Sequence, residues 1–226
     1  MVVECAFNNL YRSQHDMKKK GKSLAMKLFF SPTSPYVRKV RITAAELGLE
    51  DQIDLILTNP WENPPELADA NPLGKVPALM TSENEILFDS PVICEYLDSL
   101  NREIDLFPAT EEARWNALRL QAIADGILDA AVMIRLESLR PVTEQHSDIR
   151  TRQISVIRRA LISLCSEMTR LIGPVTIGQI AVACALGYLD FRLPEEDWRK
   201  AHPKLDCWYS SWVERKSMQM TMPPTD

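Results

Sequence analysis

The sequence of 226 residues lacks several features that would assign a chain to a functional class directly. Its five cysteines are scattered and form neither a CxxC pair nor a ligand set with zinc spacing, so we expect reduced, mostly buried thiols. Such thiols suit a reducing cytoplasm. No apolar run approaches the ~20 residues needed to cross a bilayer, and the first residues lack the apolar core of a signal peptide. We therefore expect a cytoplasmic protein with no membrane partner.

The sequence also lacks an excess of positive charge. Its net charge is −5 at pH 7, which argues against an extended basic face and against nucleic acid as a partner. Hydrophobic residues make up 46% and charged residues 25% of the chain, so a core can form without metal or disulfide bonds. The length predicts one large or two modest domains.

Three regions of the chain differ in pattern. Residues 1–25 show little periodicity and end in a basic run, so we expect a disordered basic extension, with an anchor to an anionic surface as the alternative. In residues 26–104, short apolar strands alternate with helical spacing in the order β-α-β-(loop or short helix)-β-β-α, which predicts an α/β domain with one sheet. Residues 105–226 show only helical patterns, which predict an all-α helical bundle.

One apolar segment and two helical stripes predict the core of the bundle. Residues 177–189 are apolar almost all round, as in a helix buried at the centre of a bundle. Thr176 and Gln179 have the spacing of a capping box at its start. The two stripes that we predict as core are Trp115, Leu118, Ala122, Ile127, Ala130 and Ile134, and Ile154, Ile157, Leu161, Leu164, Met168 and Leu171.

The turn between the first strand and the first helix contains Ser34, Pro35 and Tyr36. Serine before proline favours a helix start, because the hydroxyl caps a free N–H group and proline at the first helical position loses no hydrogen bond. Capping alone explains these two residues. The same helix end also attracts anions, since free N–H groups and the helix dipole point outward there, and it would stabilise a thiolate.

The size of this effect can be compared with what a bound thiol needs. A thiol with an ordinary pKa of about 8.5 needs a shift of about two units, or ~2.7 kcal/mol, to be mostly ionised at neutral pH. The dipole offers ~0.3–1 kcal/mol and a hydroxyl hydrogen bond to the charge ~1.5–3 kcal/mol, so together they reach this range. In this hypothesis Ser34 donates a hydrogen bond and is not a nucleophile.

Two later segments carry further binding signals. Pro77 opens a strand without donating to it, and a cis bond after Val76 would turn the Val76 backbone outward to pair with an extended peptide. An edge strand with a trans proline fits the sequence equally well. Asp89 and Ser90 precede Pro91 as at a second helix start, where capping is the default and the N–H groups could also receive a substrate carboxylate.

Taken in order, these segments resemble the glutathione S-transferase family, and particularly its bacterial members with serine at the thiol. The resemblance covers nearly everything after residue 25. It is carried by residues 33–39, 71–77, 88–90 and 93–97, and in the helical half by residues 124–127 and 214–217.

The resemblance implies a thioredoxin-like N-terminal domain, an all-α C-terminal domain, glutathione as co-substrate without a prosthetic group or metal, a small electrophile, and a homodimer. Ser34 would contact the glutathione sulfur and Val76 would pair by its backbone with the cysteinyl unit. Pro77 would be cis, and Asp89 and Ser90 would bind the γ-glutamyl end. The glutathione-binding residues that it implies are Ser34, Lys75, Val76, Pro77, Asp89 and Ser90.

The sequence departs from other branches of the family. Phe29 and Phe30 occupy the place where tyrosine-type members carry their catalytic tyrosine, which excludes that mechanism. Position 34 holds no cysteine, which disfavours thiol exchange. Asp125 could reach the glutathione amine, including across a dimer, or could cap or pair locally.

Three functions are consistent with these residues. We predict a transferase that conjugates glutathione thiolate to a small electrophile, with a glutathione-dependent isomerase and a non-catalytic glutathione-binding or protein-interaction protein as alternatives. Trp115, Arg119 and Tyr188 could face the electrophile, but such residues on bundle helices are usually core, so we leave them unassigned. The sequence does not identify the electrophile.

Overall fold

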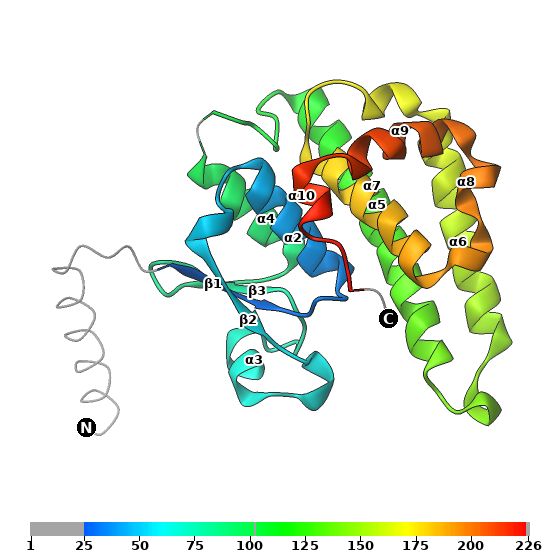
Figure 1. Cartoon of the computed structure of the whole chain (residues 1–226), viewed down its shortest axis with the longest axis horizontal. Coiled ribbons are helices and arrows are strands. Elements are labelled where there is room, and N and C mark those ends of the chain that lie inside the picture. Colours follow the sequence, from blue (N-terminus) through cyan, green and yellow to red (C-terminus); the bar gives the residue numbers. More distant parts are fainter. Residues whose placement is uncertain (1–24, 102, 225–226) are drawn as a thin grey trace, which may run out of the picture.

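The computed structural model describes residues 25–101 and 103–224. Figure 1 shows a small sheet with its helices on one side of the molecule and the long helices of the second part on the other. The chain therefore combines an α/β thioredoxin-like part with an all-α helical part, as the sequence predicts. The predicted basic extension, residues 1–25, lies outside the described residues except for Ala25.

Four short strands form one mixed sheet in the order β2-β1-β3-β4. β1 runs parallel to β2 and antiparallel to β3, and β3 runs antiparallel to β4. β3 begins at Ala78, directly after Pro77, because Pro77 has no N–H group to donate to the ladder. The strands are β1 (Met26–Phe30), β2 (Ile53–Leu57), β3 (Ala78–Met80) and β4 (Ile86–Leu87).

Helices cover both faces of the sheet. α2 (Pro35–Glu46) and α4 (Ser90–Leu100) lie together on one face, and α3 (Pro65–Ala70) lies on the other, as Figure 1 shows. The alternation of β1 explains the two layers, because successive side chains point to opposite faces. Leu28 belongs to the large core shared with α2 and α4, and Phe29 belongs to a second cluster with Leu67 of α3.

The second part of the chain packs around α7 (Ile177–Arg192). Every residue from 177 to 189 is buried, and the capping box of Thr176 and Gln179 is present, so both predictions are confirmed. α7 packs on α5 and on α2, so it joins the helical part to the sheet part. The other helices are α5 (Glu111–Ser138), α6 (Ser147–Ser166), α8 (Trp198–Ala201), α9 (Pro203–Val213) and α10 (Lys216–Gln219).

The structure confirms the predicted burial of the two core stripes to different extents. In the second stripe, Met168 is only partly buried, and the other five residues, Ile154, Ile157, Leu161, Leu164 and Leu171, are buried as predicted. The α5 stripe is wrong in its first half, since Trp115 is 65% exposed and Ala122 is also exposed. Ala122 and Ile127 are five residues apart. In a helix of 3.6 residues per turn, two residues at this spacing lie on different faces, and Ala122 does not face the neighbouring helices.

The cysteines and the lengths of the helices bear on two further predictions. The cysteines that the structure describes are free; Cys94 and Cys184 are buried, Cys165 is half-buried and Cys207 is exposed. Burial therefore holds for two of these four. Within residues 25–101 and 103–224, no helix has both the length and the apolar character that a membrane span requires.

Candidate functional site

The topology of the sheet brings the three predicted segments to one end of it. Ser34 follows the end of β1, and β3 is antiparallel to β1, with Ala78 opposite Phe29. Val76, just before β3, therefore lies at this end. β4 is antiparallel to β3, so Asp89, just after β4, also lies there. The negative charge of Asp89 reaches Tyr36 in the α2 turn, which agrees with this placement.

Ser34 is the N-cap of α2, and Pro35 is its first residue. The Ser34 Oγ accepts a hydrogen bond from the Val37 N–H at 3.3 Å. Within the part of the chain that the structure describes, the Ser34 O–H donates to no side chain or carbonyl. Capping uses an acceptor lone pair, so the donor remains available to a ligand. The cap and the predicted sulfur contact are thus compatible.

The peptide bond between Val76 and Pro77 is cis, as the resemblance implied. No hydrogen bond from another described residue reaches the N–H or C=O of Val76. The preceding loop is held by Asn71, which is buried and donates from Nδ2 to the Lys75 carbonyl at 2.8 Å. The Lys75 side chain is exposed. Asn71 holds this loop in place, a role that the sequence did not indicate.

Asp89 and Ser90 start α4 as predicted, with Asp89 as the N-cap and its carboxylate accepting from the Ser90 N–H. The bond between Phe88 and Asp89 is also cis, which the sequence did not indicate. Ser90 is 1% exposed, and its hydroxyl has no hydrogen-bond partner among the described residues. A buried polar group without a partner costs ~1–3 kcal/mol, so this hydroxyl marks a place where a ligand would bind.

Two links between α2 and α5, which the sequence did not reveal, lie directly behind the Ser34 turn. Lys39 is fully buried, and its Nζ donates to both carboxylate oxygens of Asp125 at 2.6 and 2.8 Å. The Tyr36 hydroxyl donates to Asp129 one turn further along α5. Asp125 therefore pairs within its own chain. A lysine in an amphipathic helix normally indicates a solvent-facing position, so nothing in the sequence suggested the Lys39 contact.

The charges that act on the Tyr36 hydroxyl are negative. Burial raises the pKa of Tyr36, and the carboxylates of Asp129, Asp125 and Asp89 raise it further, so the phenol stays protonated. Burial also raises the pKa of Asp125, while Lys39 opposes that rise. Three carboxylates therefore act on Tyr36 and Lys39 pairs with one of them, an arrangement that favours a cationic group on the ligand near Tyr36. In the described residues no group of three or more histidine, cysteine or carboxylate side chains could hold a metal ion.

Comparison with known proteins identifies the family. Residues 33–100 match the glutathione S-transferase N-terminal domain, and residues 148–210 match the glutathione S-transferase C-terminal domain. The chain is 37% identical over 202 residues to the uncharacterized GST-like protein YibF of Escherichia coli K12, covering 88% of this chain and 99% of that protein. The chain belongs to the glutathione S-transferase family.

Solved structures agree with this assignment. A glutathione transferase family member from Pseudomonas fluorescens Pf-5, with bound glutathione, is 42% identical with a TM-score of 0.85, covering 89% of this chain and 100% of that one. A second structure from that organism holds S-(propanoic acid)-glutathione and is 41% identical with a TM-score of 0.81, covering 89% and 99%. Both structures are thus similar to this chain over 89% of its length.

Proposed function

We propose that this chain is a glutathione transferase that joins the glutathione thiolate to a small electrophile, with the Ser34 hydroxyl donating a hydrogen bond to the sulfur. The observation that carries this proposal is the state of Ser34. Its oxygen accepts from Val37 in the cap, and its O–H has no acceptor among the described residues. A sulfur anion placed at the start of α2 would satisfy that donor and would meet the positive end of the helix dipole.

The other predicted residues offer complementary groups for the rest of glutathione. The N–H and C=O of Val76, which bind nothing else that the structure describes, match the backbone of the cysteinyl unit. The buried Ser90 hydroxyl and the N–H groups that start α4 suit a carboxylate, and Asp89 suits an ammonium. The similar structures from Pseudomonas fluorescens, one with bound glutathione and the other with a glutathione derivative, support this assignment.

Thiol activation in this proposal comes from the helix dipole and the Ser34 hydroxyl together. The dipole and the Ser34 hydrogen bond together supply ~2–4 kcal/mol, against the ~2.7 kcal/mol that ionisation at neutral pH requires. The carboxylates beside Tyr36 oppose the thiolate, and Lys39 and the ammonium of glutathione offset them. The dipole alone falls short of this requirement and the hydrogen bond supplies the larger share, so removing the hydroxyl should be visible in the pH dependence.

A second copy of the chain is part of this proposal. Apolar side chains of β2 and of the turn after it stand exposed, which suits burial against another protein surface. The four most prominent are Leu55, Ile56, Leu57 and Trp61, with exposed fractions of 42%, 37%, 73% and 69%. Sedimentation equilibrium should give twice the monomer mass, and Trp61→Lys should weaken that association. A monomer at micromolar concentration would refute the dimer and would leave the proposed transferase activity unaffected.

Three substitutions at position 34 test the proposed role of the hydroxyl. Ser34→Ala removes both the cap and the donor, while Ser34→Gly removes the donor and costs the cap only a few tenths of a kcal/mol. Ser34→Thr keeps both functions. In the pH profile, kcat/KM with a generic aryl halide should rise as the glutathione thiol ionises. This rise should shift to higher pH in the alanine and glycine variants and should stay in place in the threonine variant. If kcat/KM rises at the wild-type pH in all three variants, Ser34 does not activate the thiol.

Binding without catalysis is the alternative to be separated from this proposal. The wild-type chain should be retained on immobilised glutathione and should then turn over the aryl halide. Ser90→Ala should weaken retention, because the buried hydroxyl contacts the ligand in this proposal, while Ser99→Ala, at an exposed serine of the same helix, is the control. Retention without turnover of any aryl halide or isomerisable substrate would favour a non-catalytic binding protein.

A further inference from the structure

The contacts between α2 and α5 fix which part of α5 lies beside Ser34. Lys39 binds Asp125. Tyr36, about one turn closer to Ser34, binds Asp129, one turn further along α5. The two helices therefore run in opposite directions. It follows that the start of α2 lies beside the part of α5 that comes after Asp129.

α7 runs alongside α5 in the same direction. Near the start of α7, Gly178 lies against Ala117 and Leu120; a Cβ at Gly178 would be 2.7 Å from the Ala117 carbonyl oxygen. Near the end of α7, a Cβ at Gly187 would be 2.7 Å from the Arg38 guanidinium of α2, and the neighbouring Tyr188 lies within reach of the charge of Arg135 on α5. The last turn of α7 and the last turns of α5 therefore reach the same corner, beside the start of α2.

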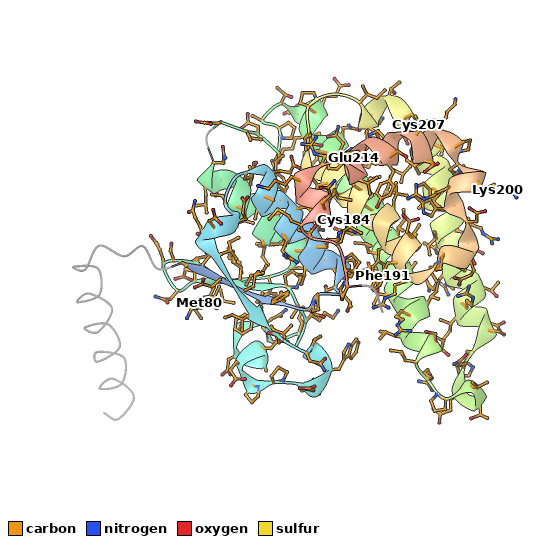
Figure 2. All side chains as sticks on the ribbon, viewed as in Figure 1. Met80, Cys184, Phe191, Lys200, Cys207 and Glu214 are labelled. Atoms are coloured by element: carbon orange, nitrogen blue, oxygen red, sulfur yellow. The ribbon has the colours of Figure 1, made fainter. Side chains whose placement is uncertain are left out.

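We call this corner the donor corner; it consists of Arg135, Tyr188, Phe191 and Arg192. Tyr188 is 7% exposed and meets Phe191 edge-on, with ring centroids 6.3 Å apart. The Arg192 guanidinium lies 3.8 Å from the Phe191 ring centroid. Figure 2 labels Phe191 next to the start of α2 in that view. The corner thus places an aromatic surface and hydrogen-bond donors near the proposed position of the sulfur.

The polar groups of the donor corner are donors at neutral pH. Burial raises the pKa of Tyr188, against the opposing charges of Arg192 and Arg135, so its hydroxyl keeps its proton. Arginine carries only donors. The donor corner as a whole is therefore complementary to an anion.

Arg135 has no counter-ion in the part of the chain that the structure describes. It is half-buried, and no carboxylate or carbonyl there binds its guanidinium. The carboxylates that flank it on α5 have other partners: Asp129 binds Tyr36, and Glu137 accepts from the His146 N–H at 2.6 Å. Partly burying a guanidinium without an acceptor is costly, and its planar fork matches a carboxylate.

We propose that Arg135, together with the Tyr188 hydroxyl, binds a carboxylate on the electrophile, so that the substrates of this enzyme are anionic electrophiles. This inference rests on the proposed transferase function. With an aryl chloride that carries a carboxylate, the sulfur–carbon bond forms, the carbon–chlorine bond breaks and chloride leaves. The carboxylate takes no part in bond making and orients the ring against Phe191.

The test compares two substrates that differ in charge, 4-chloro-3,5-dinitrobenzoate and 4-chloro-3,5-dinitrobenzamide, at saturating glutathione. Arg135→Gln should lower kcat/KM for the benzoate about tenfold, equivalent to about 1.4 kcal/mol, and change the benzamide less than about twofold. Arg135→Lys keeps the charge but not the planar fork, so it should lose less than Arg135→Gln with the benzoate and again leave the benzamide unchanged. Arg119→Gln is the matched control, because Arg119 lies on the same helix and pairs with Glu167, so the ratio of the two substrates should not change.

Each other outcome counts against the proposal. An equal loss with both substrates would assign Arg135 to packing, and an unchanged ratio would exclude a carboxylate contact. A higher KM for glutathione with the same substrate ratio would assign Arg135 to glutathione itself.

A binding experiment keeps this test separate from the transferase proposal. If neither substrate reacts, the transferase proposal fails, but calorimetry still tests the donor corner. S-(2-carboxyethyl)glutathione should bind the wild-type chain about tenfold more tightly than its amide, and Arg135→Gln should remove that difference. Equal binding of the acid and the amide to the wild-type chain would overturn the anion site.

Discussion

Replacing either member of the Lys39–Asp125 pair should destabilise the protein far more than replacing both. The Lys39 side chain is 0% exposed, and the Asp125 side chain is 21% exposed. Removing one partner of a buried pair typically costs ~3–5 kcal/mol, because the other charge is left uncompensated. The two single variants should differ, since water reaches only one of the two charges.

The structure gives the order of the effects. Asp125→Leu leaves an ammonium without water and should cost ~3–5 kcal/mol, whereas Lys39→Met leaves a partly hydrated carboxylate and should cost ~2–3 kcal/mol. The double variant replaces the pair by apolar groups and should lie within ~1 kcal/mol of wild type. Arg119→Ala breaks the more exposed Arg119–Glu167 pair and, as a control, should cost ~0–1 kcal/mol.

Urea unfolding of the four proteins measures these values as a double-mutant cycle. The series should be run at two protein concentrations, because association of two copies would add to the apparent stability. The reasoning predicts a coupling free energy of several kcal/mol between positions 39 and 125. Additive single-variant effects, or a smaller loss for Asp125→Leu than for Lys39→Met, would refute the account of the buried pair.

Four further predictions follow from other contacts. Burial raises the pKa of Glu46, but hydrogen bonds from Arg215 and Ser217 lower it below its usual value, so its contribution to stability is present above the unfolded pKa and is lost as pH falls through the folded one. Glu46→Gln should therefore flatten the dependence of Tm on pH below about 4.5, and an unaltered acid limb would contradict the assigned bonds. Gly178→Ala should cost ~1–3 kcal/mol in thermal or urea unfolding, because its Cβ would meet the Ala117 backbone at 2.7 Å. Gly126→Ala, with nothing within 4 Å, should instead stabilise α5 by up to ~1 kcal/mol, and equal effects at the two glycines would be inconsistent with the packing. Tyr36→Phe should cost about 1 kcal/mol, since Asp129 can turn to water, and a loss of several kcal/mol would show that the link is not solvent-accessible.

Local sequence signals predicted the elements that position the candidate site. Serine before proline predicted the start of α2, and the same chemistry at residues 89–91 predicted the start of α4. The apolar segment from 177 to 189 predicted a central helix because a helix that is apolar on every side needs neighbours on every side. These features depend on residues that are close together in the sequence, so the sequence was enough to predict them.

The contacts that join the two parts of the chain could not be predicted from the sequence. Lys39 and Asp125 lie 86 positions apart, and neither residue type indicates a buried partner. The Tyr36–Asp129 bond spans 93 positions and depends on how α2 crosses α5. Trp115 was misassigned for the same reason, since hydrophobic spacing alone does not tell which face of a long helix the neighbouring helices cover.

The pKa of bound glutathione tests the central claim most directly. Ultraviolet absorbance of the thiolate, recorded across pH for the wild-type complex and for Ser34→Gly, reports that pKa without requiring an electrophile. The wild-type thiol should titrate about two units below its ordinary value of about 8.5. In Ser34→Gly, which keeps the helix cap largely intact, the pKa should rise by about one to two units. The same titration in both proteins would contradict a hydrogen bond from Ser34 to the sulfur.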